Sequence, residues 1–227
     1  MRMESLEGLQ VITCKDRAEL DAWLDAHHVT APGLWLMVAK KASGVPSVTA
    51  GEIIDVALCH GWIDGQRRSY DDVYYLQKIT RRRPRGLWSK VNVQKVEALT
   101  AAGRMREAGL AEVAAAKADG RWEAAYESQR NATVPDDLTA ALAASPAARK
   151  TFEALGKSDQ YVVLHRLMTA RTPATRAARL ERMVAKLATG RPEGARGTAR
   201  PATTDPQTQK GAPGRGPSLP GALPEEL

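Results

Sequence analysis

The sequence predicts an α+β fold: a small N-terminal sheet with two helices and a β-hairpin, followed by a C-terminal helical bundle and a disordered tail. Strand-like segments occur only before residue 81, whereas the sequence after residue 89 has helical periodicity alone. Residues 190–227 hold seven Pro, seven Gly and no aromatic residue, so they bury too little apolar surface to offset their ordering entropy. We therefore expect an α+β domain over 1–130, a helical region packed on it over 131–189, and the tail over 190–227.

The first four elements alternate between strand and helix. Residues 9–14 have the composition of a short strand, and 34–40 are a continuous apolar run, which is typical of a strand buried on both faces. Between these strands, Asp16 is a suitable cap for a helix, and apolar residues follow it at helical spacing. Thr49, three residues before a glutamate, has the pattern of a capping box and predicts a helix over 50–59.

A hairpin and further helices follow. Residues 62–68 and 73–80 read as strands joined by a turn over 69–72, and 81–86 is a loop. Ser89 then caps a helix that runs to residue 102. Helices are also predicted over 106–118 and 136–144, and three more begin near residues 146, 158 and 173.

Basic charge is concentrated in two segments. The chain carries 33 Lys and Arg against 26 Asp and Glu, a net charge of +7. Residues 61–95 hold nine basic and three acidic side chains, and 158–189 hold six and two. Such concentration favours an anionic partner, namely phosphate, nucleic acid or an acidic small molecule. For 158–189 a solubilising surface is an equal alternative.

The composition also excludes several classes of protein. No run of 18 apolar residues occurs, which excludes a membrane span, and the N-terminus has no apolar signal region, so we expect a cytoplasmic protein. Cys14 and Cys59 can form neither a disulfide framework nor a four-ligand zinc site. We expect no metal and no cofactor, since neither a P-loop nor a dinucleotide-binding motif is present.

One strand face carries side chains that are unusual for a core. Alternation along 62–68 places Trp62, Asp64, Gln66 and Arg68 on the same face, which indicates a ligand-facing surface. Trp62 and a second tryptophan at position 88 offer stacking faces for a base or ring. The alternative, which we favour, is that both tryptophans fill the interface between sheet and helices.

An arginine run, Arg81–Arg83, precedes the helix that begins at Ser89. Free N–H groups and the positive end of the helix dipole favour an anion at such a start, and guanidinium groups add bidentate contacts to oxyanions. We therefore expect an anion site at this corner of the fold.

Residues that could act in catalysis have simpler interpretations. Cationic neighbours should lower the pKa of Asp64, so we expect it to orient an arginine rather than act as a general base. Cys59 and His60 are consecutive on a predicted helix and do not face each other, which favours a buried structural cysteine. His165 lies on an apolar helical stripe and is expected in the core.

The run from Ala57 to Arg67 resembles the YdeI/OmpD-associated family, also labelled bacteriocin-protection proteins. The resemblance covers nearly all of 5–189 and continues through 76–84, 87–92, 103–105, 108–110, 118–122 and the helices at 145–189. The family usually has an aromatic residue at the position of His60, and it reads Thr-Pro-Arg-Arg where this chain has an arginine in place of the proline. Arg82 and Arg83 are therefore the matching pair. The resemblance implies a bacterial cytoplasmic protein linked to envelope stress and to tolerance of bacteriocins or antimicrobial peptides, without an established molecular activity.

Three hypotheses for function follow. The first is a binding protein for a nucleotide, nucleic acid or acidic metabolite. Arg67, Arg82 and Arg83 would hold the anion, Asp64 and Gln66 would orient it, Ser89 and Asn92 would present the helix N-terminus, and Trp62 and Trp88 would line the site. The second is a detoxifying hydrolase or transferase that uses the same pocket. The third is a protein-interaction module, in which Arg176 and Arg179 of the basic 158–189 helices dock an acidic partner. The oligomeric state is left open.

Overall fold

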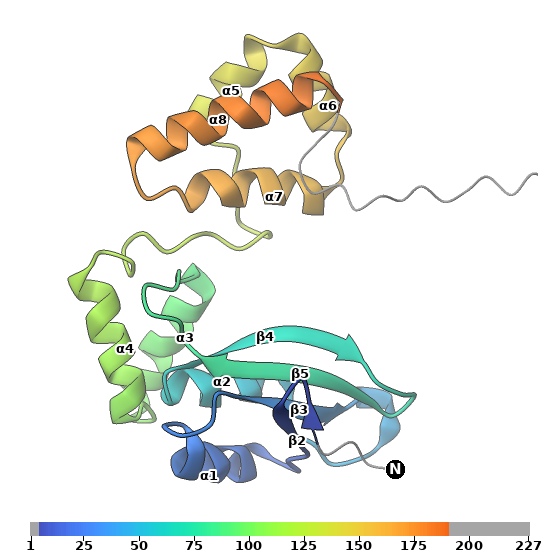
Figure 1. Ribbon diagram of the computed structural model, residues 1–227, viewed down its shortest axis with the longest axis vertical. Coiled ribbons are helices and arrows are strands. Elements are labelled where there is room, and N and C mark those ends of the chain that lie inside the picture. The colour runs from blue at the N-terminus through green and yellow to red at the C-terminus, as the bar shows by residue number, and fades with distance from the viewer. Residues whose placement is uncertain (1–4, 191–227) are drawn as a thin grey trace, which may run out of the picture. The chain divides into compact units, whose positions relative to one another are not determined.

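A computed structural model of the protein describes residues 5–190, and the predicted disordered tail lies outside the described residues apart from Gly190. The predicted α+β architecture is confirmed: a five-stranded sheet with helices is followed by helices alone (Figure 1). The sheet contains β1 (Ser5–Leu6), β2 (Leu9–Ile12), β3 (Gly33–Ala39), β4 (Trp62–Ser69) and β5 (Tyr74–Arg81). Their order is β1-β2-β3-β5-β4, with β2 and β3 parallel and the other neighbours antiparallel.

The strand β1 is the one that the sequence analysis did not predict. It pairs with β2 through a two-residue turn in which Glu7 and Gly8 both have positive φ. Two-residue hairpins prefer this conformation because its twist matches that of the strands.

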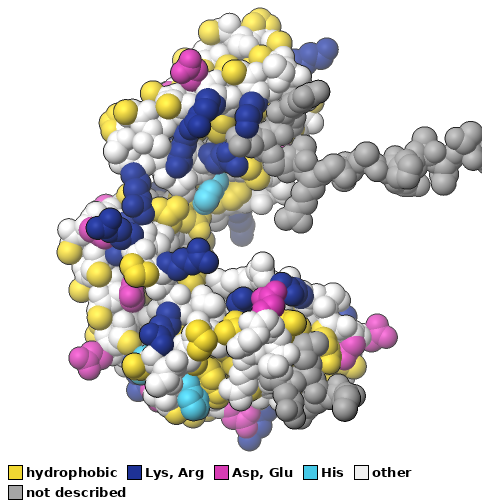
Figure 2. All heavy atoms as spheres, in the orientation of Figure 1, with side chains coloured by type: hydrophobic (Ala, Val, Ile, Leu, Met, Phe, Trp, Pro, Cys, Tyr) yellow, Lys and Arg dark blue, Asp and Glu magenta, His cyan; other side chains and the backbone are white. Residues whose placement is uncertain are grey.

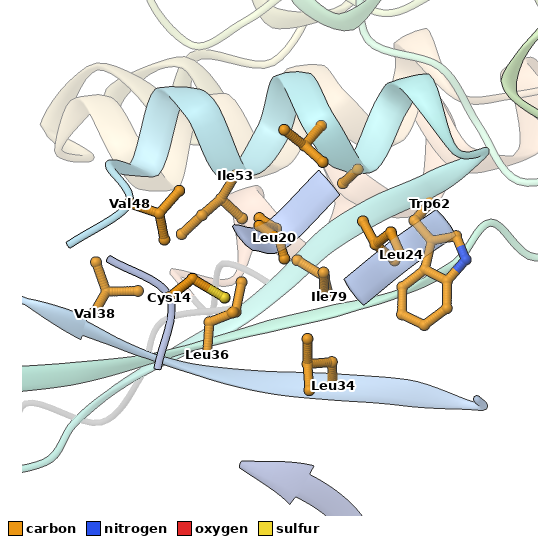
Figure 3. Close-up of a cluster of buried hydrophobic side chains, with 12 residues drawn as sticks. Cys14, Leu20, Leu24, Leu34, Leu36, Val38, Val48, Ile53, Trp62 and Ile79 are labelled. Atoms are coloured by element: carbon orange, nitrogen blue, oxygen red, sulfur yellow. The ribbon is translucent and has the colours of Figure 1, made fainter. Parts of the chain in front are cut away.

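Two helices, α1 (Arg17–His27) and α2 (Ala50–Cys59), cover one face of the sheet (Figure 1). Both start as predicted: the Asp16 side chain accepts from the Glu19 amide, and Thr49 forms a complete capping box. The main core lies between these helices and the sheet, and it includes Leu20, Leu24, Leu34, Leu36, Ile53 and Ile79 (Figure 3). On the other face of β3, Trp35 and Met37 form a smaller cluster, so the predicted burial of this strand on both faces is confirmed.

A β-bulge interrupts the pairing of β4 with β5. The register shifts between Asp64 and Arg67, so two residues of β4 lie opposite one residue of β5. The side chain of Gln77, which is 4% exposed, donates from Nε2 to the carbonyls of Gly65 and Gln66 at 3.2 and 3.4 Å. The Gln77 side chain thus supplies hydrogen-bond donors to the two carbonyls of the bulge, which explains why a glutamine is buried in an apolar strand.

The bulge corrects the predicted strand face. Trp62 and Asp64 share the face that the helices cover, but simple alternation fails beyond them. Arg68 lies opposite Leu76 on the other face, where its guanidinium is 5.1 Å from the Trp35 ring. Gln66 accepts a hydrogen bond from Arg68, so these two side chains do not join Trp62 and Asp64 in one surface.

Two further helices, α3 (Lys90–Ala101) and α4 (Glu107–Ala118), build a second core with the end of α2. Its buried members include Leu58, Cys59, Trp88, Val96, Leu99, Val113 and Trp122. Gly109 allows the close approach of α4, because a Cβ at this position would lie 2.7 Å from the Leu58 carbonyl oxygen and nearer still to that of Cys59.

The C-terminal helices are α5 (Asp136–Ala143), α6 (Pro146–Ala154), α7 (Lys157–Met168) and α8 (Pro173–Ala188), and they share a core of their own. Arg176 on α8 makes a bidentate pair with Asp137 on α5, at 2.7 and 2.9 Å, and also donates to the Leu167 carbonyl. The expected packing of 131–189 on the first domain stays a prediction. Among the described residues, no helix combines the length and apolar character that crossing a membrane requires.

Candidate anion-binding sites

The two tryptophans of the predicted site are core residues. Trp62 is 1% exposed, packs among the residues of the main core, and donates from Nε1 to the His28 carbonyl at 3.3 Å. Trp88 is 2% exposed and contacts Trp122 in the second core, with 4.9 Å between ring centroids. Both rings are buried, which argues against the stacking role and agrees with the favoured alternative, in which the tryptophans fill the interface.

The predicted helix start is present, but two of its first backbone N–H groups already have acceptors within the chain. The Ser89 hydroxyl accepts from the Asn92 amide at 3.2 Å, which is the predicted N-cap. The next amide, that of Lys90, donates to the Tyr126 carbonyl at 2.9 Å. Both amides therefore have partners other than an external anion, which weakens the argument from the helix N-terminus.

The three predicted arginines have different surroundings, although Arg67 and Arg82 both lie close enough to Asp64 to influence its pKa. Arg67 donates to Gln77 Oε1 at 3.1 Å and lies 4.5 Å from the centre of the Tyr75 ring, on the exposed part of β4. Arg83 is exposed in the loop after β5. Arg82 is buried, so these three side chains lie in three different environments.

Arg82 has unusual surroundings for a cation. It is 7% exposed, and its guanidinium carbon lies 3.6 Å from the centre of the Trp88 ring. Its Nη2 donates to the Leu87 carbonyl at 2.8 Å, whereas Nε and Nη1 have no acceptor. Burial lowers the pKa of Arg82 to about 10, so the group remains charged at neutral pH.

Asp64 differs from its predicted state. It is half-buried, and burial raises the pKa of its carboxyl group more than Arg67 and Arg82 lower it. A lowered pKa was predicted from the cationic neighbours alone. The larger effect is desolvation by the folded chain, which cannot be seen in the local sequence.

Cys59 and His60 have structural surroundings. Cys59 is buried in the second core, and burial raises the pKa of its thiol, as expected for an inert cysteine. The buried His60 ring bonds through Nε2 to Asp21 Oδ1 at 2.8 Å, and Arg106 pairs with the same carboxylate. Within residues 5–190 no group of three or more His, Cys, Asp or Glu side chains is arranged to hold a metal ion.

A basic hollow lies between α7 and α8. It has a volume of about 290 Å³, and its lining consists of Arg166, Thr169, Arg179, Arg182, Met183 and Lys186. Four of these six residues are cations, and within residues 5–190 no acidic side chain lines the hollow. Figure 2 shows Lys and Arg side chains gathered over this pair of helices.

The geometry of the hollow follows from helical spacing. Arg179, Arg182 and Lys186 lie on one face of α8, three and four residues apart. Arg179 donates from Nη1 to the Arg166 carbonyl at 2.7 Å and to the Thr169 hydroxyl at 3.3 Å, which holds one guanidinium against the end of α7. The sequence showed the basic excess of 158–189, but the hollow exists only because α7 and α8 pair.

Arg176 does not belong to this surface. Its pairing with Asp137 makes it a link between α5 and α8, so the proposed docking role of Arg176 is not supported, whereas Arg179 lines the hollow.

The protein thus combines a mixed sheet, covered by helices, with a C-terminal group of helices that has its own core and a basic hollow. Residues 131–190 match the family described as bacteriocin-protection, YdeI or OmpD-associated, which confirms the resemblance over these residues. Residues 12–112, which contain the motif from Ala57 to Arg67, match a domain of unknown function (DUF8412). Neither the curated proteins nor the solved structures contain a match to the chain.

Proposed function

We propose that this protein binds an anionic ligand in the basic hollow between α7 and α8, and that it does so in the cytoplasm in a stress or antimicrobial-tolerance role. The observation that carries the proposal is the lining of the hollow, in which the described residues include four cationic side chains and no acidic one, within the segment that matches the YdeI/OmpD-associated family. An anion that enters the hollow is attracted by the cationic side chains that line it.

The chemistry of the hollow favours an oxyanion. Arginine presents several N–H donors in a planar fork that fits phosphate or carboxylate oxygens, and three of the four cations are arginines. Because Arg179 is already held by α7, less side-chain freedom is lost when a ligand binds. The volume of about 290 Å³ lies at the lower end of ligand pockets, so the hollow accommodates one acidic group or a small metabolite, or a phosphate of a longer chain.

Charge reversal tests this proposal. Arg182→Glu/Lys186→Glu changes two exposed cations of the hollow, and Lys150→Glu/Lys157→Glu makes the same change in charge elsewhere on the helical domain. Binding of adenosine triphosphate and of a fluorescein-labelled DNA single strand would be measured by calorimetry and by anisotropy. We expect the first variant to weaken binding at least about tenfold and the control to change it less than about threefold.

The outcomes separate the possible ligands and sites. Steep loss of DNA affinity between about 50 and 200 mM salt indicates a nucleic-acid ligand, and a weak salt dependence indicates a small anion. Equal effects of the two double variants would refute the hollow as the site. If Arg83→Ala lost binding while the hollow was intact, the binding site would be the loop after β5, as the sequence analysis predicted.

The raised pKa of Asp64 favours the second candidate, a hydrolase or transferase. A carboxyl group whose pKa is shifted toward neutrality suits general acid–base chemistry. Hydrolysis of p-nitrophenyl acetate and p-nitrophenyl phosphate would be measured for the wild type and Asp64→Asn. The enzyme reading requires turnover that this substitution abolishes without a change in thermal stability, and turnover equal to that of buffer would reject it for these substrates.

A further inference from the structure

Three unsatisfied donors belong to one pair of residues in contact, Arg82 and Trp88. Among the described residues, four buried side-chain N–H positions lack an acceptor: Trp35 Nε1, Arg82 Nε, Arg82 Nη1 and Trp88 Nε1. Three of these four belong to the stacked pair of Arg82 and Trp88. Buried donors in folded proteins nearly always have an acceptor, so three in one contact pair point to a bound group.

The charge of this pair is unbalanced as well. Among the described residues, no carboxylate lies within ion-pair distance of Arg82; Glu112 and Asp64 act on it only from farther away. Arg121 adds a second positive charge nearby, and Tyr126 is the remaining ionisable neighbour. A buried charge is normally paired, because the cost of its desolvation is otherwise uncompensated.

We propose that the Arg82–Trp88 pair binds a small inorganic anion of the halide class, such as chloride. An anion supplies both missing features, a negative charge and an acceptor for several N–H groups at once, whereas a water molecule supplies no charge. Both residues are more than nine-tenths buried and the three donor atoms are closed to solvent, so an organic ligand is excluded and a small ion would enter only as the pair moves slightly apart. The site is separate from the hollow on α7 and α8 and does not depend on the function proposed for it.

The anion would join three parts of the domain. Arg82 follows directly after β5, and its backbone amide donates to the Gly61 carbonyl at 3.1 Å. Trp88 precedes α3 and packs on Trp122, which follows α4. A group that binds the folded state alone stabilises it in proportion to the logarithm of its concentration, so the protein should unfold at a higher temperature in halide.

Glu112 provides the rival explanation. It lies on α4, beside Gly61, and its negative charge acts on Arg82 more strongly than that of Asp64. If its side chain turns inward in solution, it becomes the counter-ion, and no external anion is needed. The substitution Glu112→Gln distinguishes the two explanations.

Thermal unfolding of the full chain tests the proposal, with sodium gluconate exchanged for sodium chloride or bromide at constant ionic strength. We expect halide to raise the Tm of the wild type by roughly 2–6 °C. The rise should persist in Arg83→Gln, the exposed neighbour, in Glu112→Gln, and in the hollow variant Arg182→Glu/Lys186→Glu. It should vanish in Arg82→Gln and shrink in Trp88→Phe, which keeps a ring but removes one donor.

Bromide anomalous scattering in crystals of the wild type provides a second readout if Arg82→Gln fails to fold. A bromide peak within hydrogen-bonding distance of Arg82 Nε or Nη1 is expected. A Tm that does not respond to halide in the wild type would overturn the proposal. So would a halide response that disappears only in the hollow variant, a water molecule at the expected position, or the Glu112 carboxylate on Arg82.

Discussion

Gly109 in the first turn of α4 gives the sharpest test of how the N-terminal domain is packed. An added Cβ would lie 2.7 Å from the Leu58 carbonyl oxygen and closer to that of Cys59, below the 3.0 Å that real Cβ atoms keep. Both obstacles are backbone atoms at the end of α2, which cannot rotate away. The helix α4 would therefore have to move by several tenths of an ångström, which strains the hydrogen bond from the Arg106 amide to the Cys59 carbonyl.

Gly109→Ala combines two opposing effects. Alanine is the better helix former by up to about 1 kcal/mol. Overpacking costs about 1–3 kcal/mol in cores that can adjust, and contact with fixed backbone lies at or beyond the upper end. We expect a net loss of about 2 kcal/mol, which lowers the Tm by roughly 4–8 °C for a protein of this size.

Gly51→Ala is the matched control. Gly51 also lies in the first turn of a helix, α2, and a Cβ there would meet nothing within 4 Å. The free energy of unfolding of this variant should be unchanged or higher by up to about 1 kcal/mol, so its Tm should be equal to or slightly above that of the wild type. Calorimetry and urea unfolding would measure both variants. A Gly109→Ala protein as stable as the wild type would show that α4 does not pack on the end of α2 as described.

Three further predictions concern pH, thiols and capping. The pairing with Arg176 lowers the pKa of Asp137, so the contribution of the Asp137 carboxylate to stability is present above its unfolded pKa and is lost as pH falls through its folded pKa. Arg176→Gln should therefore make acid unfolding below about pH 5 less steep, as measured by circular dichroism. An unchanged acid transition would contradict this. Burial raises the pKa of Cys14 to about 12 and also raises that of Cys59, so native protein at pH 8 should react with Ellman's reagent far more slowly than protein in urea, and fast reaction of either thiol would contradict its burial. Thr49→Ala removes the cap of α2 and should cost about 1 kcal/mol, or roughly 2–4 °C in Tm, whereas a change below 1 °C would mean that the capping box adds little.

The two candidate sites have different relations to the sequence. The hollow between α7 and α8 uses residues whose basic excess was visible in the sequence, and the fold decided which of them converge. Arg182 and Lys186 line the hollow, whereas Arg176 from the same helix pairs with Asp137 on α5. At the Arg82–Trp88 pair, the sequence analysis favoured a core position for the tryptophan but expected the arginine in an exposed anion site, whereas the structure buries both.

Local signals were sufficient for the elements. The apolar run of β3 and the caps at Asp16, Thr49 and Ser89 are encoded in residues that are close in sequence, and the structure has each of them. These features depend on hydrogen bonds and periodicity within a few residues, so no knowledge of the rest of the chain is needed.

Tertiary structure alone decided the sites. The bulge at Gly65 and Gln66 depends on the pairing of β4 with β5 and on the Gln77 side chain, and it changed which side chains share a face. The burial of Arg82 depends on Trp88, and the raised pKa of Asp64 depends on the solvent that the surrounding chain excludes. The sequence by itself thus determined every strand except β1, every α-helix, the order of these elements and the basic segments, because these arise from neighbouring residues. Which charges are buried, paired or gathered in a hollow was decided by contacts between residues far apart in the chain.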